Sequence, residues 1–126
     1  MAKRAGLDRA ANGSVATIDD LASIVAYLQE TLGSTLTAVV AGVRRADLVA
    51  EWAAGRRRPN SDEEARLRTA HEVATLLATL EHPDVIRAWF MGMNPELDDE
   101  AAAMVIARDP NPEPVMLATR AFLQYG

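Results

Sequence analysis

The chain has 126 residues, 49% hydrophobic and 25% charged, with a net charge of −5, which fits one modest globular domain or two small units that share a core, rather than a disordered segment. With no cysteine and two histidines it has no disulfide framework, no thiolate nucleophile and no sulfur ligands for zinc, so we expect no metal and no cofactor. No apolar run reaches the length of a membrane span, and the first thirteen residues lack the apolar middle of a signal peptide, so we expect a cytoplasmic protein with no membrane partner.

Glycines and capping residues divide the chain into seven expected helices. Gly33, Gly42 and Gly55 each follow an apolar run at helical spacing and are expected to end a helix. Ser34 is expected to cap the second helix, and Asn60 to open the fourth with a capping box. No segment shows sustained alternation of apolar and polar residues, so strands are not expected and the fold class is all-α. The expected elements are a flexible N-terminal arm at residues 1–16 and helices near residues 17–32, 34–42, 45–54, 60–80, 83–90, 100–107 and 115–124, with loops at 91–99 and 109–114.

The charge is spread unevenly along the chain. The segment from Gly42 to Pro59 holds five arginines against Asp47 and Glu51 and carries +3, whereas residues 60–126 carry −7. This asymmetry suggests two surfaces with different partners. An ordinary solvated surface with chance clustering is the alternative interpretation.

The stretch AVVAGVRRADLVAEWAAGRRRP, from Ala38 to Pro59, has the pattern of a helix-turn-helix. A glycine at the turn takes positive φ at low cost, and a small residue four positions earlier lets two helices cross closely. The stretch resembles the Xre and lambda-repressor type of helix-turn-helix, in which a small residue, a glycine, a leucine, a tryptophan, a glycine and a proline recur in this order. The resemblance implies that the second helix meets the major groove of DNA. The residues expected to bind DNA are Arg44, Arg45, Arg56, Arg57 and Arg58.

Two acidic residues weaken this expectation of DNA binding. Asp47 and Glu51 are expected on the exposed face of the same helix, where they would repel phosphate. The five arginines also fit the interpretation of solvated loop charges. DNA binding is therefore expected as a second activity, or as one that needs a dimer or a partner.

The second half of the chain has a resemblance of its own. VIRAWFMGMNPELDDEAAAMVIARDPNPEPVMLATRAFL, residues 85–123, resembles the toxin-binding domain of the Xre/MbcA/ParS antitoxins. In that family a helix ending in Ala-Trp-hydrophobic leads to an Asn-Pro loop, and a leucine, a short helix and an apolar helix follow. The matching residues are Ala88, Trp89, Phe90, Asn94, Pro95, Leu97, Val105, Ile106, Arg108 and Asp109.

Together the two resemblances imply an all-α antitoxin, with an Xre-like helix-turn-helix domain at residues 17–66 and a small helical toxin-binding domain at residues 67–126. They imply a type II toxin–antitoxin system in which this chain covers the active site of a RES-domain toxin that degrades NAD, represses the shared operon through operator DNA, and forms a homo-oligomer or a hetero-oligomer with the toxin. The second half holds more large apolar side chains than a small helical unit needs inside, so some are expected on a contact surface, although all of them also fit a core. The residues expected to bind the toxin are Trp89, Phe90, Met91, Met93, Asn94, Arg108, Met116, Phe122 and Tyr125.

Catalytic motifs are missing from the sequence. It has no phosphate-binding loop, nucleophile elbow or zinc-protease helix, and His71 and His82 are expected on the polar side of a helix and at a helix boundary. We therefore expect no enzyme. Two alternatives to an antitoxin stay open: a helix-turn-helix repressor without a toxin partner, and an adaptor module whose helices only dimerise.

Overall fold

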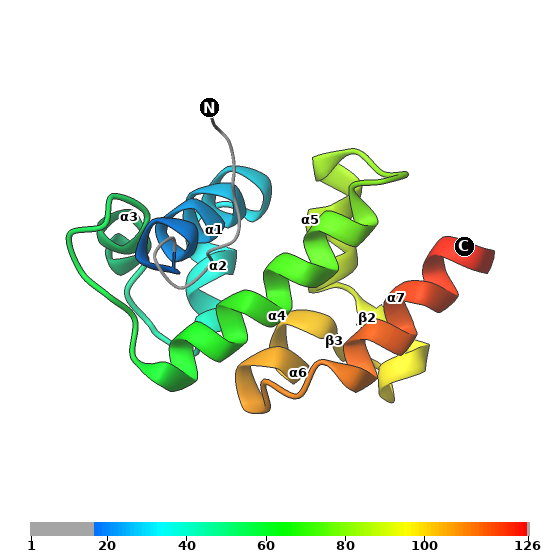
Figure 1. The fold of residues 1–126 in the computed structure, drawn as a ribbon. Helices are drawn as coiled ribbons and strands as arrows, with labels where there is room; N and C mark the ends of the chain where they lie inside the picture. The colour runs from blue at the N-terminus through cyan, green and yellow to red at the C-terminus, as the bar shows by residue number, and fades with distance from the viewer. Residues whose placement is uncertain (1–16, 126) are drawn as a thin grey trace.

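The structure is a computed structural model that describes residues 17–125, with side chains from Asp20 onward (Figure 1). The N-terminal arm expected at residues 1–16 lies outside the described residues. The described chain is mostly helical, which confirms the all-α class. Its helices are α1 (Thr17–Leu32), α2 (Ser34–Ala41), α3 (Asp47–Ala53), α4 (Ser61–Leu77), α5 (Pro83–Met91), α6 (Ala102–Arg108) and α7 (Glu113–Tyr125), with a 3-10 turn η2 (Pro95–Leu97) and strands β2 (Met93–Asn94) and β3 (Glu100–Ala101).

The helix boundaries follow the expected glycines and caps. Gly33, Gly42 and Gly55 all have positive φ, between 76° and 88°, a conformation that glycine adopts without the steric cost of a Cβ. Asn60 accepts a hydrogen bond from Glu63 N, and the Glu63 side chain accepts one from Asn60 N, so the capping box is confirmed.

The cap expected at Ser34 is wrong. The N-cap of α2 is Gly33, and no side chain caps this helix end. Ser34 Oγ instead accepts a hydrogen bond from Gln29 Nε2 at 3.1 Å. The reason is that only one residue separates α1 from α2, so Gly33, with its positive φ, both follows the end of α1 and is the N-cap of α2.

The expectation of no strands is wrong, because a small antiparallel ladder joins the expected loop at residues 91–99 to the first two residues of the helix expected at 100–107. Met93 pairs with Ala101 and Asn94 with Glu100, and η2 closes the connection between the strands. Each strand has two residues, too few for alternation to appear in the sequence. The ladder directs the backbone from α5 toward α6.

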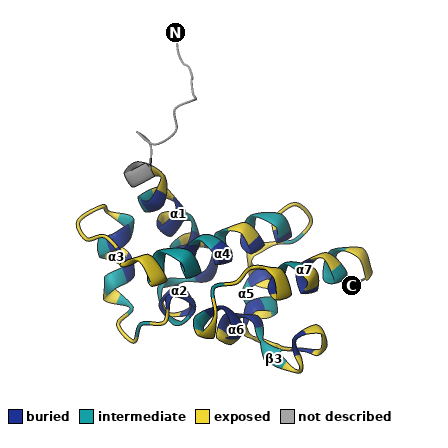
Figure 2. Cartoon of the chain, turned by 60° about the horizontal axis from the view of Figure 1, so that its bottom comes forward, coloured by how far each residue is buried: buried dark blue, intermediate teal, exposed yellow. Residues whose placement is uncertain are grey.

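Helix α4 organises the hydrophobic core and packs against α1, α2, α6 and α7 (Figure 1). Its inner face is fully buried at Leu67, Val73 and Leu77, and the dark blue residues of Figure 2 face inward from the other helices as well. Helices α2 and α6 also pack against each other, so residues before and after the middle of α4 contribute to one continuous core. Among the described residues, no helix combines the length and the apolar composition needed to cross a bilayer.

Candidate partner-binding groove and basic turn

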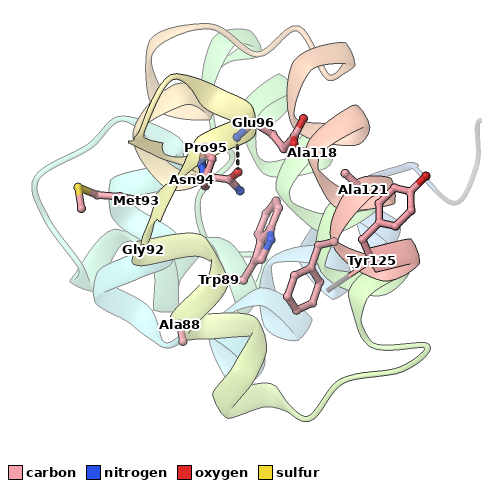
Figure 3. Close-up of a pocket in the computed structure, with 11 residues that line it drawn as sticks. Ala88, Trp89, Gly92, Met93, Asn94, Pro95, Glu96, Ala118, Ala121 and Tyr125 are labelled. Atoms are coloured by element: carbon pink, nitrogen blue, oxygen red, sulfur yellow. Dashed lines mark hydrogen bonds between the residues drawn. The ribbon is translucent and has the colours of Figure 1, made fainter.

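A groove with a volume of about 360 Å³ opens between α5, β2 and α7 (Figure 3). One wall is the end of α5 with the segment Gly92–Glu96, and the other is the side of α7 that carries Ala118, Ala121, Phe122 and Tyr125. Aromatic and apolar side chains dominate its lining, which includes Trp89, Met93, Asn94, Glu96, Phe122 and Tyr125.

Helical periodicity explains how α5 presents Trp89 to this groove. Ile86 and Phe90 occupy one face of α5 and are almost fully buried, with Phe90 at 0% exposure. Trp89 lies beside this face and is half-buried, edge-on to Phe90 with ring centroids 5.6 Å apart. The buried phenylalanine therefore holds the indole ring in place at the surface.

On α7 the same spacing leads from the core to the rim of the groove. Val115, Ala118 and Thr119 are buried, and Phe122 follows at the next turn, half-buried. The Phe122 ring lies 6.3 Å from that of Trp89, between centroids. Tyr125, one turn further, is 82% exposed at the open end.

Asn94 forms the polar part of the groove and is only 8% exposed. Its side-chain Oδ1 accepts a hydrogen bond from Glu96 N at 2.9 Å and thereby caps η2, which begins at Pro95. An asparagine before a proline is well suited to this turn, since proline needs no partner for its missing N–H. The bond also fixes which end of the amide points to the backbone.

The structure brings together five of the nine residues expected to bind the toxin. The groove is lined by Trp89, Met93, Asn94, Phe122 and Tyr125. Phe90 requires a correction, because its side chain is fully buried and serves the core. Burial follows from the helical spacing of Ile86 and Phe90, which places both on the inner face of α5.

The remaining three lie elsewhere. Met116 is half-buried against the core. Met91 is exposed and lines a different depression, about 470 Å³ in volume, with Leu36, Val39 and Met104. Met104 was not singled out from the sequence, although the buried Ala102, Ala103, Val105 and Ile106 around it in α6 would have indicated an outward methionine.

Arg108 forms an ion pair rather than lining the groove. Both of its terminal nitrogens donate to the Glu100 carboxylate at 2.7 Å, joining β3 to the end of α6. The hydrogen bond from Arg108 holds the pKa of the Glu100 carboxyl below its usual value. Both side chains are exposed, so this ion pair is a surface contact between β3 and the end of α6.

The five arginines expected to bind DNA surround α3, but three of them have acidic partners. Arg45 pairs with Asp47 at 2.5 Å, Arg57 with Glu51 at 3.0 Å, and Arg58 with Glu64 at 3.1 Å. The hydrogen bond from Arg45 lowers the pKa of Asp47. Arg44 and Arg56 are exposed, and neither forms an ion pair with another residue of the described chain.

A residue that sequence reasoning missed supports the turn between α2 and α3. The Arg66 guanidinium, from α4, donates through Nη1 to Ala41 O at 3.4 Å, at the end of α2. A Cβ added at Gly42 would lie 3.1 Å from the same Nη1. Arg66 therefore packs directly beneath the turn, where cations are favoured by the exposed carbonyls of a helix end.

The two histidines occupy ordinary structural positions. His82 Nδ1 accepts a hydrogen bond from Asp84 N and caps α5. His71 is half-buried on α4 with its ring edge-on to Tyr27, and burial lowers its pKa. Within residues 20–125 no three His, Asp or Glu side chains are grouped so that they could hold a metal ion.

No protein-family model, no curated protein and no solved structure matches this chain at a significant level. The function proposed below therefore rests on the residues of this chain and on their arrangement.

Proposed function

We propose that this chain is the antitoxin of a type II toxin–antitoxin system, which binds a RES-domain, NAD-degrading toxin and covers its active site. The observation that carries the proposal is the groove between α5, β2 and α7. Trp89, Asn94 and Pro95, which belong to the resemblance to the toxin-binding domain, all line this groove. Residues that carry the resemblance thus line the groove that also contains Trp89, Phe122 and Tyr125.

The exposure of this surface supports a protein partner. Met93 and Tyr125 are each 82% exposed although both side chains are large and mainly apolar. Contiguous apolar surface that remains open to water is typical of protein-binding sites, and aromatic residues and methionine are enriched in them. Covering these side chains would release the hydrophobic free energy that the isolated chain leaves unused.

The first half of the chain supports a more specific assignment than a helical fold, namely an Xre-like helix-turn-helix domain. Ala38 is buried in α2, Gly42 ends that helix in the left-handed region, and Val49 and Trp52 of α3 are buried behind the turn. These are the roles that the resemblance implies for a small residue, a glycine and a tryptophan. We propose the helix-turn-helix domain at residues 17–66 and the toxin-binding domain at 67–126.

Repression through operator DNA is a second activity of the proposal, favoured by Arg44 and Arg56. Both lie beside α3 without an acidic partner among the described residues, whereas the other three arginines are paired. Binding to the upstream promoter, measured by fluorescence anisotropy at several salt concentrations, is expected to lose about one unit of log–log salt slope for each of Arg44→Ala and Arg56→Ala. Arg108→Ala, which removes an exposed arginine outside this region, is the control and leaves the slope unchanged.

The main test is co-expression with the adjacent reading frame, followed by purification through a tag on this chain. The expected result is a stoichiometric RES-domain partner that is retained by wild type and lost with Tyr125→Asp, which introduces a charge at the open end of the groove without removing a core side chain. Leu80→Asp is the matched control, because Leu80 is a large exposed apolar residue outside the groove. A protein that purifies alone beside a harmless neighbour would refute the antitoxin and leave the repressor.

A further inference from the structure

Two side chains that line the groove, Asn94 and Trp89, carry hydrogen-bond donors without an acceptor among the described residues. Because Asn94 Oδ1 is occupied by Glu96 N, its Nδ2 is the free end of the amide, and no residue of the described chain accepts from it. Figure 3 shows the amide oxygen on the dashed bond and the nitrogen on the side of Trp89. The indole Nε1 of Trp89, which can only donate, also has no acceptor in the described structure.

Both donors belong to residues that line the groove, and neither nitrogen is fully buried. The only fully buried side-chain polar atom without a partner among the described residues is Arg66 Nε, which lies at the turn after α2. The nitrogens of Asn94 and Trp89 are therefore in contact with solvent, although Asn94 as a whole is nearly buried. A partner that covers the groove must supply acceptors, since a donor buried without one costs about 1–3 kcal/mol.

An extended segment supplies such acceptors and a helix does not. The carbonyls of a helix are bonded within the helix except in its last turn, whereas an extended chain leaves every second carbonyl free on each side. Both residues of β2 line the groove, and β2 pairs with β3 alone in the described sheet, so one edge of this strand has no strand partner. Adding an extended peptide to an open strand is a common mode of protein recognition.

The charge around the groove indicates which type of charged side chain the partner segment carries. Glu96 is the one charged residue among the described groove lining. The chain from residue 60 onward carries a net charge of −7, so the surroundings add to the same negative field. A basic side chain on the partner is favoured opposite Glu96.

We propose that the groove holds an extended segment of the toxin, with an apolar side chain against Trp89 and Phe122, a main-chain carbonyl that accepts from Asn94 Nδ2, and a lysine or arginine opposite Glu96. This inference rests on the proposed antitoxin function and adds the chemistry of the segment that is recognised. Asn94 then has two roles: its Oδ1 orders η2, and its Nδ2 binds the partner.

The test uses Asn94→Asp, because a carboxylate still accepts from Glu96 N but has no donor. Asn111→Asp is the matched control: Asn111 Oδ1 also accepts from a backbone N–H two residues on, Glu113 N at 3.2 Å before α7, and Asn111 lies outside the groove. Calorimetric titration of the co-purified RES-domain toxin is expected to show affinity lowered about tenfold or more by Asn94→Asp and changed less than about twofold by Asn111→Asp. Equal affinity for wild type and Asn94→Asp would overturn the inference.

A second measurement covers the case in which Asn94→Asp unfolds the chain. A photo-crosslinking phenylalanine placed at position 125, where Tyr125 is exposed at the open end of the groove, is expected to label a non-helical toxin segment that contains lysine or arginine. Labelling of a helical face, or no labelling in a complex that forms normally, would overturn the inference while the antitoxin function stands. If no RES-domain toxin binds wild type, the proposed function fails and the inference fails with it.

Discussion

Replacement of Gly42 by alanine tests the packing of the turn between α2 and α3. Gly42 has φ 84°, and an alanine in this region costs about 1–2 kcal/mol. The new Cβ would lie 3.1 Å from Arg66 Nη1, so the guanidinium must shift by a few tenths of an ångström and its hydrogen bond to Ala41 O, already 3.4 Å long, is weakened, which adds up to about 1 kcal/mol. We therefore expect Gly42→Ala to lower the free energy of unfolding by about 2–3 kcal/mol, or the melting temperature by about 8–12 °C.

Gly55 is the internal reference for this measurement. It has φ 76°, but a Cβ there meets no atom within 4 Å, so Gly55→Ala is expected to cost only the backbone term of about 1–2 kcal/mol. Urea unfolding of both variants, in wild type and in Arg66→Ala, separates the two terms. In the Arg66→Ala background the excess cost at Gly42 should disappear. Equal costs at the two glycines in wild type, or an excess that survives Arg66→Ala, would refute the reasoning.

Three further predictions concern the core, one histidine and one ion pair. Phe90→Ala should lower the free energy of unfolding by about 3–5 kcal/mol in urea, whereas Tyr125→Ala should change it by less than about 0.5 kcal/mol; similar effects would contradict the assigned burial. Because burial lowers the pKa of His71, the unfolded chain takes up this proton before the folded chain does as pH falls. The contribution of His71 to the free energy of unfolding is therefore complete above the ordinary pKa of 6.5 and decreases as pH falls toward the folded pKa. His71→Gln should reduce this dependence of the free energy of unfolding on pH between pH 7 and pH 5, measured by urea titrations. Arg108 lowers the pKa of Glu100, so the stabilising effect of this ion pair is present above the ordinary Glu pKa of 4.5 and is lost as pH falls through the folded pKa. Arg108→Ala should raise the pKa of Glu100, measured by nuclear magnetic resonance titration. An unchanged pKa would refute the pairing.

The helix pattern could be predicted from the sequence because its signals are local. Gly33 and Gly42 end helices through their own backbone freedom, and Asn60 with Glu63 closes a capping box within four residues. Each of these signals needs only neighbours in the chain. The boundaries of the seven helices agree with the expected ones to within a few residues. The two short strands and the absence of a cap at Ser34 were not expected.

The groove could be predicted only in part, because it depends on contacts between distant residues. Trp89 and Phe90 are adjacent and both aromatic, yet one faces the groove and the other the core, and this choice depends on where α5 packs. Arg66 lies 25 residues from Ala41 and shows its role only when α4 is placed beneath the turn. Similarly, the partners of Arg57 and Arg58 emerged only from the folded chain, since neither spacing is that of a helical ion pair.

The most direct test of the antitoxin proposal is the NAD-consuming activity of the purified RES-domain toxin, titrated with this chain. The account predicts that activity falls to background at a stoichiometric amount of wild-type chain, and that Tyr125→Asp requires a large excess while Leu80→Asp behaves as wild type. A toxin that stays fully active in the presence of saturating wild-type chain would contradict the account.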